Sequence, residues 1–194
     1  MKKTINFLLI IILTFCNNHT QAQDINKQKH TTMATADFTT TIVVDQTPKQ
    51  VLDAINNVRG WWSEEIEGST HKLNDVFNYH YEDVHSCTVQ LIEVIADKRL
   101  VWKILDNHFN FTKDKTEWID TKISFEISRQ GDKTQLVFTH IGLVPEYECY
   151  EACHQGWTHY IQNSLKNLIE TGKGLPNAKG TPRTATEKKL TSAN

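Results

Sequence analysis

The chain has 194 residues, which suits one domain of ordinary size with a tail at each end. Hydrophobic residues make up 39% and charged residues 23% of it, and this composition excludes both wholesale disorder and a protein with several membrane spans. The formal net charge is only −2, without a basic stripe that could neutralise phosphates, so we do not expect nucleic acid as a partner.

The N-terminal residues 1–23 are typical of a secretory signal peptide. Lys2 and Lys3 precede a short apolar run, and a small residue, Ala22, lies near the end of the segment. The apolar run is too short to cross a bilayer comfortably. We therefore predict an exported, periplasmic protein with no transmembrane span in the mature chain.

Two features leave a cytoplasmic form open. Met33 lies in the polar linker over residues 24–36 and could serve as an alternative start of translation. Beyond the leader the chain also keeps an odd number of cysteines, Cys87, Cys149 and Cys153. The last two are four residues apart, about 5 to 6 Å between Cβ atoms on a helix, which is too wide for a relaxed disulfide. We interpret all three as buried, reduced thiols, as is usual in the cytosol.

The first predicted elements are a strand and a capped helix. Residues 38–44 are β-branched and strand-like. Thr47 and Gln50 have the spacing of a capping box, and Pro48 between them is pre-set for the first turn of a helix. The sequence therefore predicts a short helix that begins at Pro48 and ends before Gly60.

A series of strands follows this helix. Apolar and polar residues alternate, and turn sequences separate the runs, which predicts antiparallel pairing. The clearest case is the run from Ile119 to Ser128, where every second side chain belongs to one inner face. The predicted strands span residues 76–81, 87–94, 100–105, 119–128 and 136–140.

The last predicted element is a long amphipathic helix from Pro145 to Thr171. Its inner face is small, soft and aromatic near the start and plainly apolar near the end, so we expect a cavity along the first half and core packing along the second. The chain beyond it is polar, which predicts a flexible tail over residues 177–194. The inner positions are Cys149, Cys153, Gly156, Trp157, Tyr160, Ile161, Ser164, Leu165, Leu168 and Ile169.

The order of these elements predicts the fold class. Consecutive strands bracketed by helices, with hairpin-length turns, imply an α+β fold with an antiparallel sheet. The sheet must bury one face, and only the C-terminal helix is long enough to cover it. We therefore predict one domain over residues 37–176, in which a curved antiparallel sheet of about six strands wraps around that helix, with a short helical segment after the first strand.

Several short motifs carry a resemblance to a known superfamily. They are Phe38-Thr39-Thr40-Thr41-Ile42 leading to Pro48, Val58-Arg59-Gly60-Trp61-Trp62, Trp102, Phe138-Thr139-His140-Ile141-Gly142-Leu143, Gly156-Trp157, Ser164-Leu165 and Gly172-Lys173-Gly174. In these the chain resembles the helix-grip (SRPBCC, START-like) superfamily. It is more closely similar to bacterial proteins like the C-terminal domain of the heat-shock protein 90 ATPase activator. The resemblance implies the helix-grip fold and a cavity between sheet and helix, but it leaves function open because the superfamily includes lipid carriers, hormone receptors, cyclases and co-chaperones.

The residues of mixed aromatic and polar character predict where a ligand would bind. We expect Trp102 and Trp157 to form walls and His140 to be a hydrogen-bonding tip. Because adjacent side chains after a helix cannot both point inward, one of Trp61 and Trp62 is expected to anchor the helix and the other to border the cavity. The alternative is a core filled by the same side chains. The full predicted set is Trp61, Tyr79, Tyr81, Trp102, His140, Cys149, Cys153, Trp157 and Tyr160.

Metal binding and catalysis are weaker interpretations of the same region. Histidines and cysteines occur there, but without a Cys-x-x-Cys pair or a short His-Glu-x-x-His run, so we expect no metal and no cofactor. Glu117, His140 and Cys149 or Cys153 could supply acid/base or nucleophilic chemistry, but their spacing selects no mechanism. We therefore predict no catalytic residues.

The predicted function is non-catalytic binding of a small hydrophobic or amphipathic ligand in a cavity between the sheet and the C-terminal helix. The first alternative is a protein-interaction module of co-chaperone or stress-response type, which docks a partner through the sheet or the Trp61-Trp62 corner. The second is a cavity enzyme of cyclase or hydrolase type.

Overall fold

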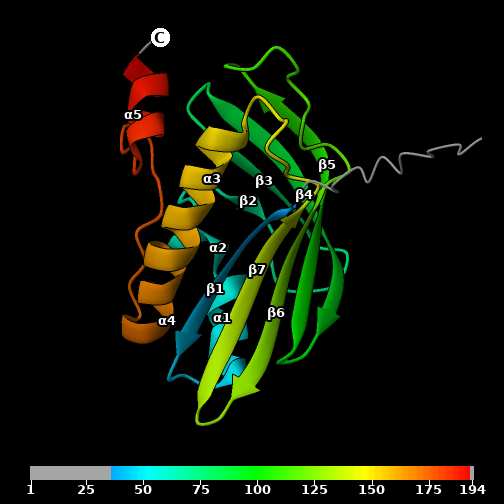
Figure 1. Cartoon of the computed structure of the whole chain (residues 1–194), viewed down its shortest axis with the longest axis vertical. Helices are drawn as coiled ribbons and strands as arrows, with labels where there is room; N and C mark the ends of the chain where they lie inside the picture. Colours follow the sequence, from blue (N-terminus) through cyan, green and yellow to red (C-terminus); the bar gives the residue numbers. More distant parts are fainter. Residues whose placement is uncertain (1–35, 193–194) are drawn as a thin grey trace, which may run out of the picture. The chain divides into compact units, whose positions relative to one another are not determined.

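The computed structural model describes residues 36–192. The predicted signal peptide, residues 1–23, and nearly all of the predicted linker lie outside the described residues. Figure 1 shows a single sheet with one long helix along it, shorter helices in the lower half of the view and a further one at the top, at the C-terminus. The strands are β1 (Phe38–Val44), β2 (Glu67–Gly68), β3 (Val76–Tyr81), β4 (His85–Ile95), β5 (Arg99–Phe109), β6 (Lys122–Gln130) and β7 (Lys133–Ile141).

The sheet has the strand order β1-β7-β6-β5-β4-β3-β2, and every neighbouring pair is antiparallel. From β3 to β7 each strand pairs with the next one along the chain, whereas β1 pairs with β7 and so joins the start of the domain to its end. The α+β fold with a curved antiparallel sheet and a C-terminal helix is confirmed. It has seven strands rather than about six, because the two-residue β2 is too short to leave a periodic signal.

Several strand boundaries differ from the sequence prediction, at β4, β5, β6 and β7. β5 continues to Phe109, beyond the predicted end at residue 105. β6 begins at Lys122 rather than at Ile119, because Asp120 has a φ of 66° and a strand cannot pass through that left-handed conformation.

The first helix, α1 (Pro48–Asn56), has the predicted start. The Thr47 side chain accepts a hydrogen bond from the Gln50 backbone N–H, and the Gln50 side chain accepts one from the Thr47 backbone N–H. These two bonds satisfy donors that a helix end otherwise leaves unpaired. Val51 and Ile55 on its inner face are fully buried.

Both tryptophans of the corner after α1 are buried, so the expectation that they could not both point inward is wrong. The short helix α2 (Val58–Trp61) and the αR conformation of Trp62 turn both rings under the sheet, where they stack 6.2 Å apart. Trp102 from β5 stacks on each of them. Trp61 also anchors the corner to α1, since its Nε1–H donates to the Ile55 carbonyl at 3.0 Å.

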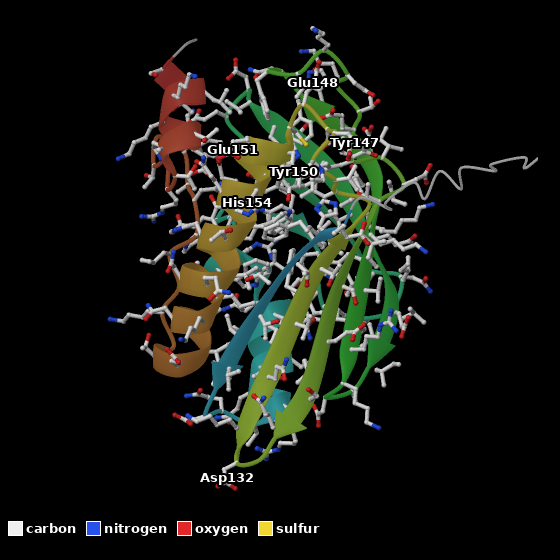
Figure 2. All side chains as sticks on the ribbon, in the orientation of Figure 1. Asp132, Tyr147, Glu148, Tyr150, Glu151 and His154 are labelled. Atoms are coloured by element: carbon white, nitrogen blue, oxygen red, sulfur yellow. The ribbon has the colours of Figure 1, made fainter. Side chains whose placement is uncertain are left out.

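The long C-terminal helix consists of three continuous segments: α3 (Tyr150–Thr158), η1 (His159–Leu165) and α4 (Lys166–Thr171). It begins five residues later than predicted by the sequence, because residues 145–149 form turns. The middle segment η1 is a π-helix, a wider turn that the α-helical spacing did not predict. Figure 2 shows the loop with Tyr147 and Glu148 leading into α3, and Asp132 at the distant tip of the β6–β7 hairpin.

Hydrogen bonds and a close backbone contact join the second half of this helix and the residues after it to the corner that contains Trp61 and Trp62. The Ser164 hydroxyl donates to the Trp61 carbonyl at 2.7 Å and accepts from the Leu175 backbone N–H at 2.6 Å. Gly174 lies so close to Gly60 that a Cβ atom added to Gly174 would be 2.0 Å from the Gly60 carbonyl oxygen. Only glycine allows this approach of two backbones.

The predicted flexible tail contains a further helix, α5 (Ala185–Ser192). α5 lies alongside α3 and contributes no fully buried side chain, although Leu190 packs against the core. Its start has a capping box: the Thr184 hydroxyl accepts from the Glu187 backbone N–H, and the Glu187 carboxylate accepts from the Thr184 backbone N–H. Among residues 36–192, no helix has the length and apolar content needed to cross a membrane.

Candidate functional site

A pocket opens between the sheet and the first half of the C-terminal helix. Its volume is about 70 Å³, which leaves room for roughly two water molecules at about 30 Å³ each. β3, β4 and β5 supply one wall, α3 and η1 the other, and α5 closes one side. The lining residues are Trp62, Tyr79, Tyr81, Val84, His85, Phe109, Phe111, Trp118, Ala152, Cys153, Gly156, Trp157, Tyr160, Thr184, Thr186, Glu187 and Leu190.

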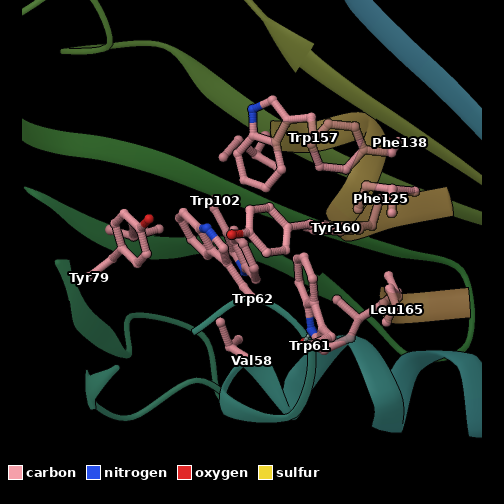
Figure 3. Packing of buried hydrophobic residues seen from close by; sticks show 14 of the residues in the cluster. Val58, Trp61, Trp62, Tyr79, Trp102, Phe125, Phe138, Trp157, Tyr160 and Leu165 are labelled. Atoms are coloured by element: carbon pink, nitrogen blue, oxygen red, sulfur yellow. Dashed lines mark hydrogen bonds between the residues drawn. The ribbon is translucent and has the colours of Figure 1, made fainter. Parts of the chain in front are cut away.

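Aromatic rings form most of this lining. Trp62 stacks on Tyr79 at a centroid distance of 4.4 Å, and Trp118 stacks on Trp157 at 5.7 Å. Figure 3 shows the adjoining core, where the rings of Trp61, Trp62 and Trp102 lie between Tyr79 on one side and Leu165 on the other. The pocket therefore lies at the end of a continuous aromatic cluster, where the side chains leave a space between them.

Three tyrosine hydroxyls mark the polar side of the pocket. Tyr160 donates to the Glu187 carboxylate at 2.6 Å, and Tyr79 accepts from the Asn177 side chain at 3.1 Å. The Tyr81 hydroxyl has no partner at hydrogen-bonding geometry, although Thr191 of α5 lies nearby. Burial raises the pKa of all three tyrosines, that of Tyr81 to about 12, and the negative charge of Glu187 raises it further in each case.

His85 is the histidine that lines the pocket. Burial lowers its pKa to about 3, so the ring is neutral near pH 7. The Asn107 side-chain amide donates to the Lys115 carbonyl, which leaves its oxygen to accept from His85 Nε2–H at 2.9 Å. The ring also contacts Phe109 at a tilt and meets Trp118 edge to face. His85 thus behaves as a neutral aromatic wall.

The structure brings five of the nine predicted ligand-binding residues onto the pocket: Tyr79, Tyr81, Cys153, Trp157 and Tyr160. The other four, Trp61, Trp102, His140 and Cys149, are buried but do not line it. Trp62 occupies the position at the pocket that was assigned to Trp61. Ligand contact by any of the nine stays a prediction.

His140 is placed in the core, and both of its ring nitrogens are bonded within the protein. Trp157 Nε1–H donates to His140 Nδ1 at 3.0 Å, so the neutral ring carries its proton on Nε2 and donates to Thr121 at 2.9 Å. Thr121 in turn donates to the Trp118 carbonyl. Burial lowers the pKa of His140 to about 3, which keeps it neutral. In this arrangement His140 orients Trp157 and has no free hydrogen-bonding tip for a ligand.

Two of the groups considered for catalysis, Glu117 and His140, are engaged in hydrogen bonds within the protein. Glu117 caps the start of the C-terminal helix, where its carboxylate accepts from the backbone N–H groups of Glu148 and Cys149. Burial raises the pKa of the Cys153 thiol, which leaves little of the nucleophilic thiolate near pH 7. Within residues 36–192, no group of three or more His, Cys, Asp and Glu side chains has the geometry to hold a metal ion.

Sequence reasoning missed several pocket residues. Phe109 and Trp118 lie between the predicted strands 100–105 and 119–128, where no periodicity distinguishes them. His85 lies just before the predicted strand 87–94. Glu187 and Leu190 were placed in the flexible tail. The spacing of Thr184 and Glu187, a capping box like that of α1, was the one local signal that could have indicated α5.

Two further surface hollows are larger, about 260 and 610 Å³. Their linings consist mostly of polar or charged side chains. Apolar and aromatic walls with few polar groups are the usual features of a small-molecule site, so the pocket beneath α3 is the better candidate in spite of its size.

An antiparallel sheet that wraps around a C-terminal helix, with an aromatic pocket between them, defines a helix-grip protein. The family profile described as Activator of Hsp90 ATPase homolog 1-like protein matches residues 47–170, which cover α1 through almost all of α4. The chain belongs to this family. No curated protein sequence matches the chain significantly.

Solved structures share the fold at low sequence identity. The solution structure of the Aha1 dimer from Colwellia psychrerythraea matches with a TM-score of 0.58 at 20% identity, covering 72% of this chain and 99% of that one. The protein SSP2350 from Staphylococcus saprophyticus matches at 0.55 and 15% identity, covering 74% and 98%. MLL2253 from Mesorhizobium loti matches at 0.53 and 12% identity, covering 68% and 96%. The family and the fold support a ligand-binding or activator-like domain.

Proposed function

We propose that the domain binds a small hydrophobic or amphipathic molecule in the pocket beneath α3 and does not transform it. The observation that supports this is the contrast within one aromatic cluster. At Trp61 and Trp102 the rings are fully buried and packed, whereas at Tyr79, Trp118 and Tyr160 the same cluster surrounds a space. Rings on the walls and a few polar tips suit an apolar molecule with one polar group.

The pocket must widen to accept such a molecule. Small-molecule sites usually measure about 300 to 1,000 Å³, several times the present volume. The wall formed by α5 is the one that can move with least loss, because α5 buries no side chain fully, whereas the other walls are strands and the helix that covers them. Few buried contacts are the mark of a segment that opens locally.

The chemistry of the lining supports binding over catalysis. The neutral His85 has both a low pKa and a hydrogen bond from Nε2, so it is a weak base near pH 7. Cys153 has a raised pKa, and the tyrosines are protonated. A general base or nucleophile needs a pKa close to the working pH or a partner that activates it.

The test compares two variants of the same helix. Ala152 lines the pocket on α3, and Glu151 beside it is exposed. We expect decanoic acid and decanol titrations to change tryptophan fluorescence, since three indoles line the pocket. Ala152→Leu should abolish the change by filling the space, and Glu151→Leu should keep it. Native mass spectrometry of the untreated protein should show a bound small molecule. Equal responses from both variants would exclude this pocket.

A second candidate, an activator-like protein-interaction module, is favoured by the family membership alone. Docking through the Trp61-Trp62 corner is not compatible with this conformation, because both side chains are buried. A partner would have to use the outer face of the sheet. The measurement is the ATPase rate of an Hsp90-type chaperone with and without the protein. Stimulation that survives Ala152→Leu would support this candidate over the first, and an unchanged rate would count against it.

We further propose that the chain is exported, on the sequence of residues 1–23 alone. N-terminal sequencing of the protein recovered from cells tests this. A first residue of Gln23 or Asp24 is expected, and Met33 would indicate the cytoplasmic form instead.

A further inference from the structure

We infer that α5 acts as a built-in occupant of the ligand site and that the site takes an amphipathic carboxylate, which displaces α5 when it binds. The inference rests on the proposed function, since it names the class of ligand and the control of the same pocket. It is carried by the contacts of Glu187 and Leu190, by the unpaired donors of the lining, and by the position of α5 relative to the family domain.

α5 presents to the pocket the two groups that an amphipathic acid would bring. Leu190 supplies an aliphatic side chain that packs against the aromatic core, and Glu187 supplies a carboxylate. The two residues are three apart and so lie on one face of the helix. Glu187 Oε1 accepts from the Tyr160 hydroxyl at 2.6 Å, while Oε2 accepts from the backbone of Thr184.

Several polar groups of the lining that α5 covers are hydrogen-bond donors. The Tyr160 hydroxyl donates its proton to Glu187, and the Tyr79 hydroxyl accepts from Asn177 and so keeps its own proton free to donate. Two buried groups of the lining, the Tyr81 hydroxyl and Trp118 Nε1, have no partner at hydrogen-bonding geometry. Among residues 36–192, neither Lys nor Arg lines the pocket. Unpaired hydrogen-bond donors suit an oxygen acceptor, and the site already accommodates the carboxylate of Glu187.

An ammonium ligand is the alternative chemistry, because aromatic walls also attract cations. The only carboxylate of the lining belongs to α5, the wall that must move. A cation that displaced α5 would lose its counter-charge and would meet the unpaired donors. A carboxylate that displaced α5 would take the place of Glu187 at Tyr160.

α5 is separable from the domain that it covers. The family match ends at residue 170, before α5 begins. α5 is joined to α3 by a side-chain hydrogen bond between Thr186 and Gln155 and to η1 by that between Glu187 and Tyr160. These are exposed or half-buried contacts, suited to reversible release.

Competition between α5 and the ligand makes a quantitative prediction. When only a fraction of molecules has α5 released, the apparent dissociation constant is the intrinsic one divided by that fraction. Glu187→Ala removes the carboxylate and the cap of α5 together, so it should raise the released fraction. We expect decanoate to bind this variant about threefold to tenfold more tightly than the unaltered protein. Glu170→Ala on α4, an exposed glutamate remote from the pocket, is the matched control and should leave binding unchanged.

The experiment uses the full chain with three probes of equal length: decanoate, decanol and decylamine. Isothermal titration should rank decanoate first. Hydrogen exchange at residues 185–192 should become faster on adding decanoate, while residues 150–165 become slower. Faster exchange of the tail together with tighter binding by Glu187→Ala supports the inference.

The outcomes that overturn the inference differ from those that overturn ligand binding. Slower exchange at residues 185–192 with decanoate would show a lid that closes over the ligand, contrary to displacement. Decylamine or decanol binding more tightly than decanoate would exclude the carboxylate class while leaving the pocket function intact. Failure of all three probes to bind both the unaltered chain and Glu187→Ala would overturn the pocket function and the inference together.

Discussion

The two ends of the C-terminal helix use similar residues to opposite effect. At the packed end, η1 is bonded to Trp61, whose ring packs with Trp102 and Phe125, and two glycines bring backbones into contact. At the open end, α3 faces Tyr79, Trp118 and the half-buried Phe111 across a space. Aromatic content is high at both ends. What differs is whether a neighbouring backbone completes the enclosure, and at the open end only the added helix α5 does so.

The largest expected difference between the two ends is in stability. Trp61→Ala at the packed end should lower the free energy of unfolding by about 3 to 5 kcal/mol, because it removes a fully buried ring and leaves a cavity among rigid neighbours. Phe111→Ala at the open end should cost about 1 kcal/mol or less, since the ring is only partly buried. Urea unfolding measures both. Similar costs would mean that the open end is as firmly packed as the corner.

The close approach of Gly174 to Gly60 gives the second effect. Gly174→Ala forces a methyl group against a backbone oxygen that cannot rotate away, and we expect a loss of about 3 kcal/mol. Gly131→Ala at the tip of the β6–β7 hairpin is a useful control, since its Cβ meets nothing within 4 Å and only the positive φ of 62° is strained. If Gly174→Ala lowers the free energy of unfolding no more than Gly131→Ala does, the backbones of Gly174 and Gly60 can move apart without loss of stability.

The buried histidines His85 and His140 should make the stability of the domain depend on pH. The pKa of His140 is about 3 in the folded protein and about 6.5 in the unfolded chain, so below pH 6.5 the unfolded chain binds a proton that the folded protein does not. Stability is therefore fully present above pH 6.5 and is lost as the pH falls toward 3. From pH 7 to pH 5 the expected loss is about 2 kcal/mol for each such histidine.

His140→Gln isolates this contribution, since glutamine does not titrate. Urea unfolding at pH 7, 6 and 5 should show a decline that is smaller by about 2 kcal/mol in the variant than in the unaltered protein. His85, which has the same lowered pKa, still titrates in both proteins and so cancels in the difference. An identical decline would show that His140 can take up a proton without unfolding the domain.

The sequence predicted the packed end better than the open end, and the reason is physical. β1 and the capping box of α1 are local patterns of alternation and hydrogen-bond spacing, and the bounds of β1 and the start of α1 were predicted correctly. Leu165 and Ile169 follow helical spacing because a continuous core requires it. A pattern of this kind states which face of an element is buried, which is enough to define a packed layer.

The open end depends on information that periodicity does not contain. The turn of α2 decides whether Trp61 or Trp62 reaches the pocket. Both side chains are buried because the sheet and the C-terminal helix enclose them. His140 has the residue type of a ligand contact, but Trp157 and Thr121 occupy both its nitrogens. α5 was not predicted because its sequence is polar and has only one local helix signal, the capping box. Leu190 shows its role only in the folded structure, where it packs against the core at the pocket.

The smallest expected effect tests the comparison most directly, because it makes the same substitution at the other end of the helix. Gly156 lies inside α3 and lines the pocket, and a Cβ there would meet only the Tyr160 ring edge at 3.9 Å. Gly156→Ala should therefore raise the free energy of unfolding by about 0.5 to 1 kcal/mol, since glycine costs that much backbone entropy within a helix. The added methyl group also takes up part of the pocket, so decanoate should bind more weakly.

Gly174→Ala should lower stability, and Gly156→Ala should raise it while reducing ligand affinity. Opposite signs are the signature of one end built to be filled by the protein and the other left for a ligand; the same sign at both glycines would remove the distinction.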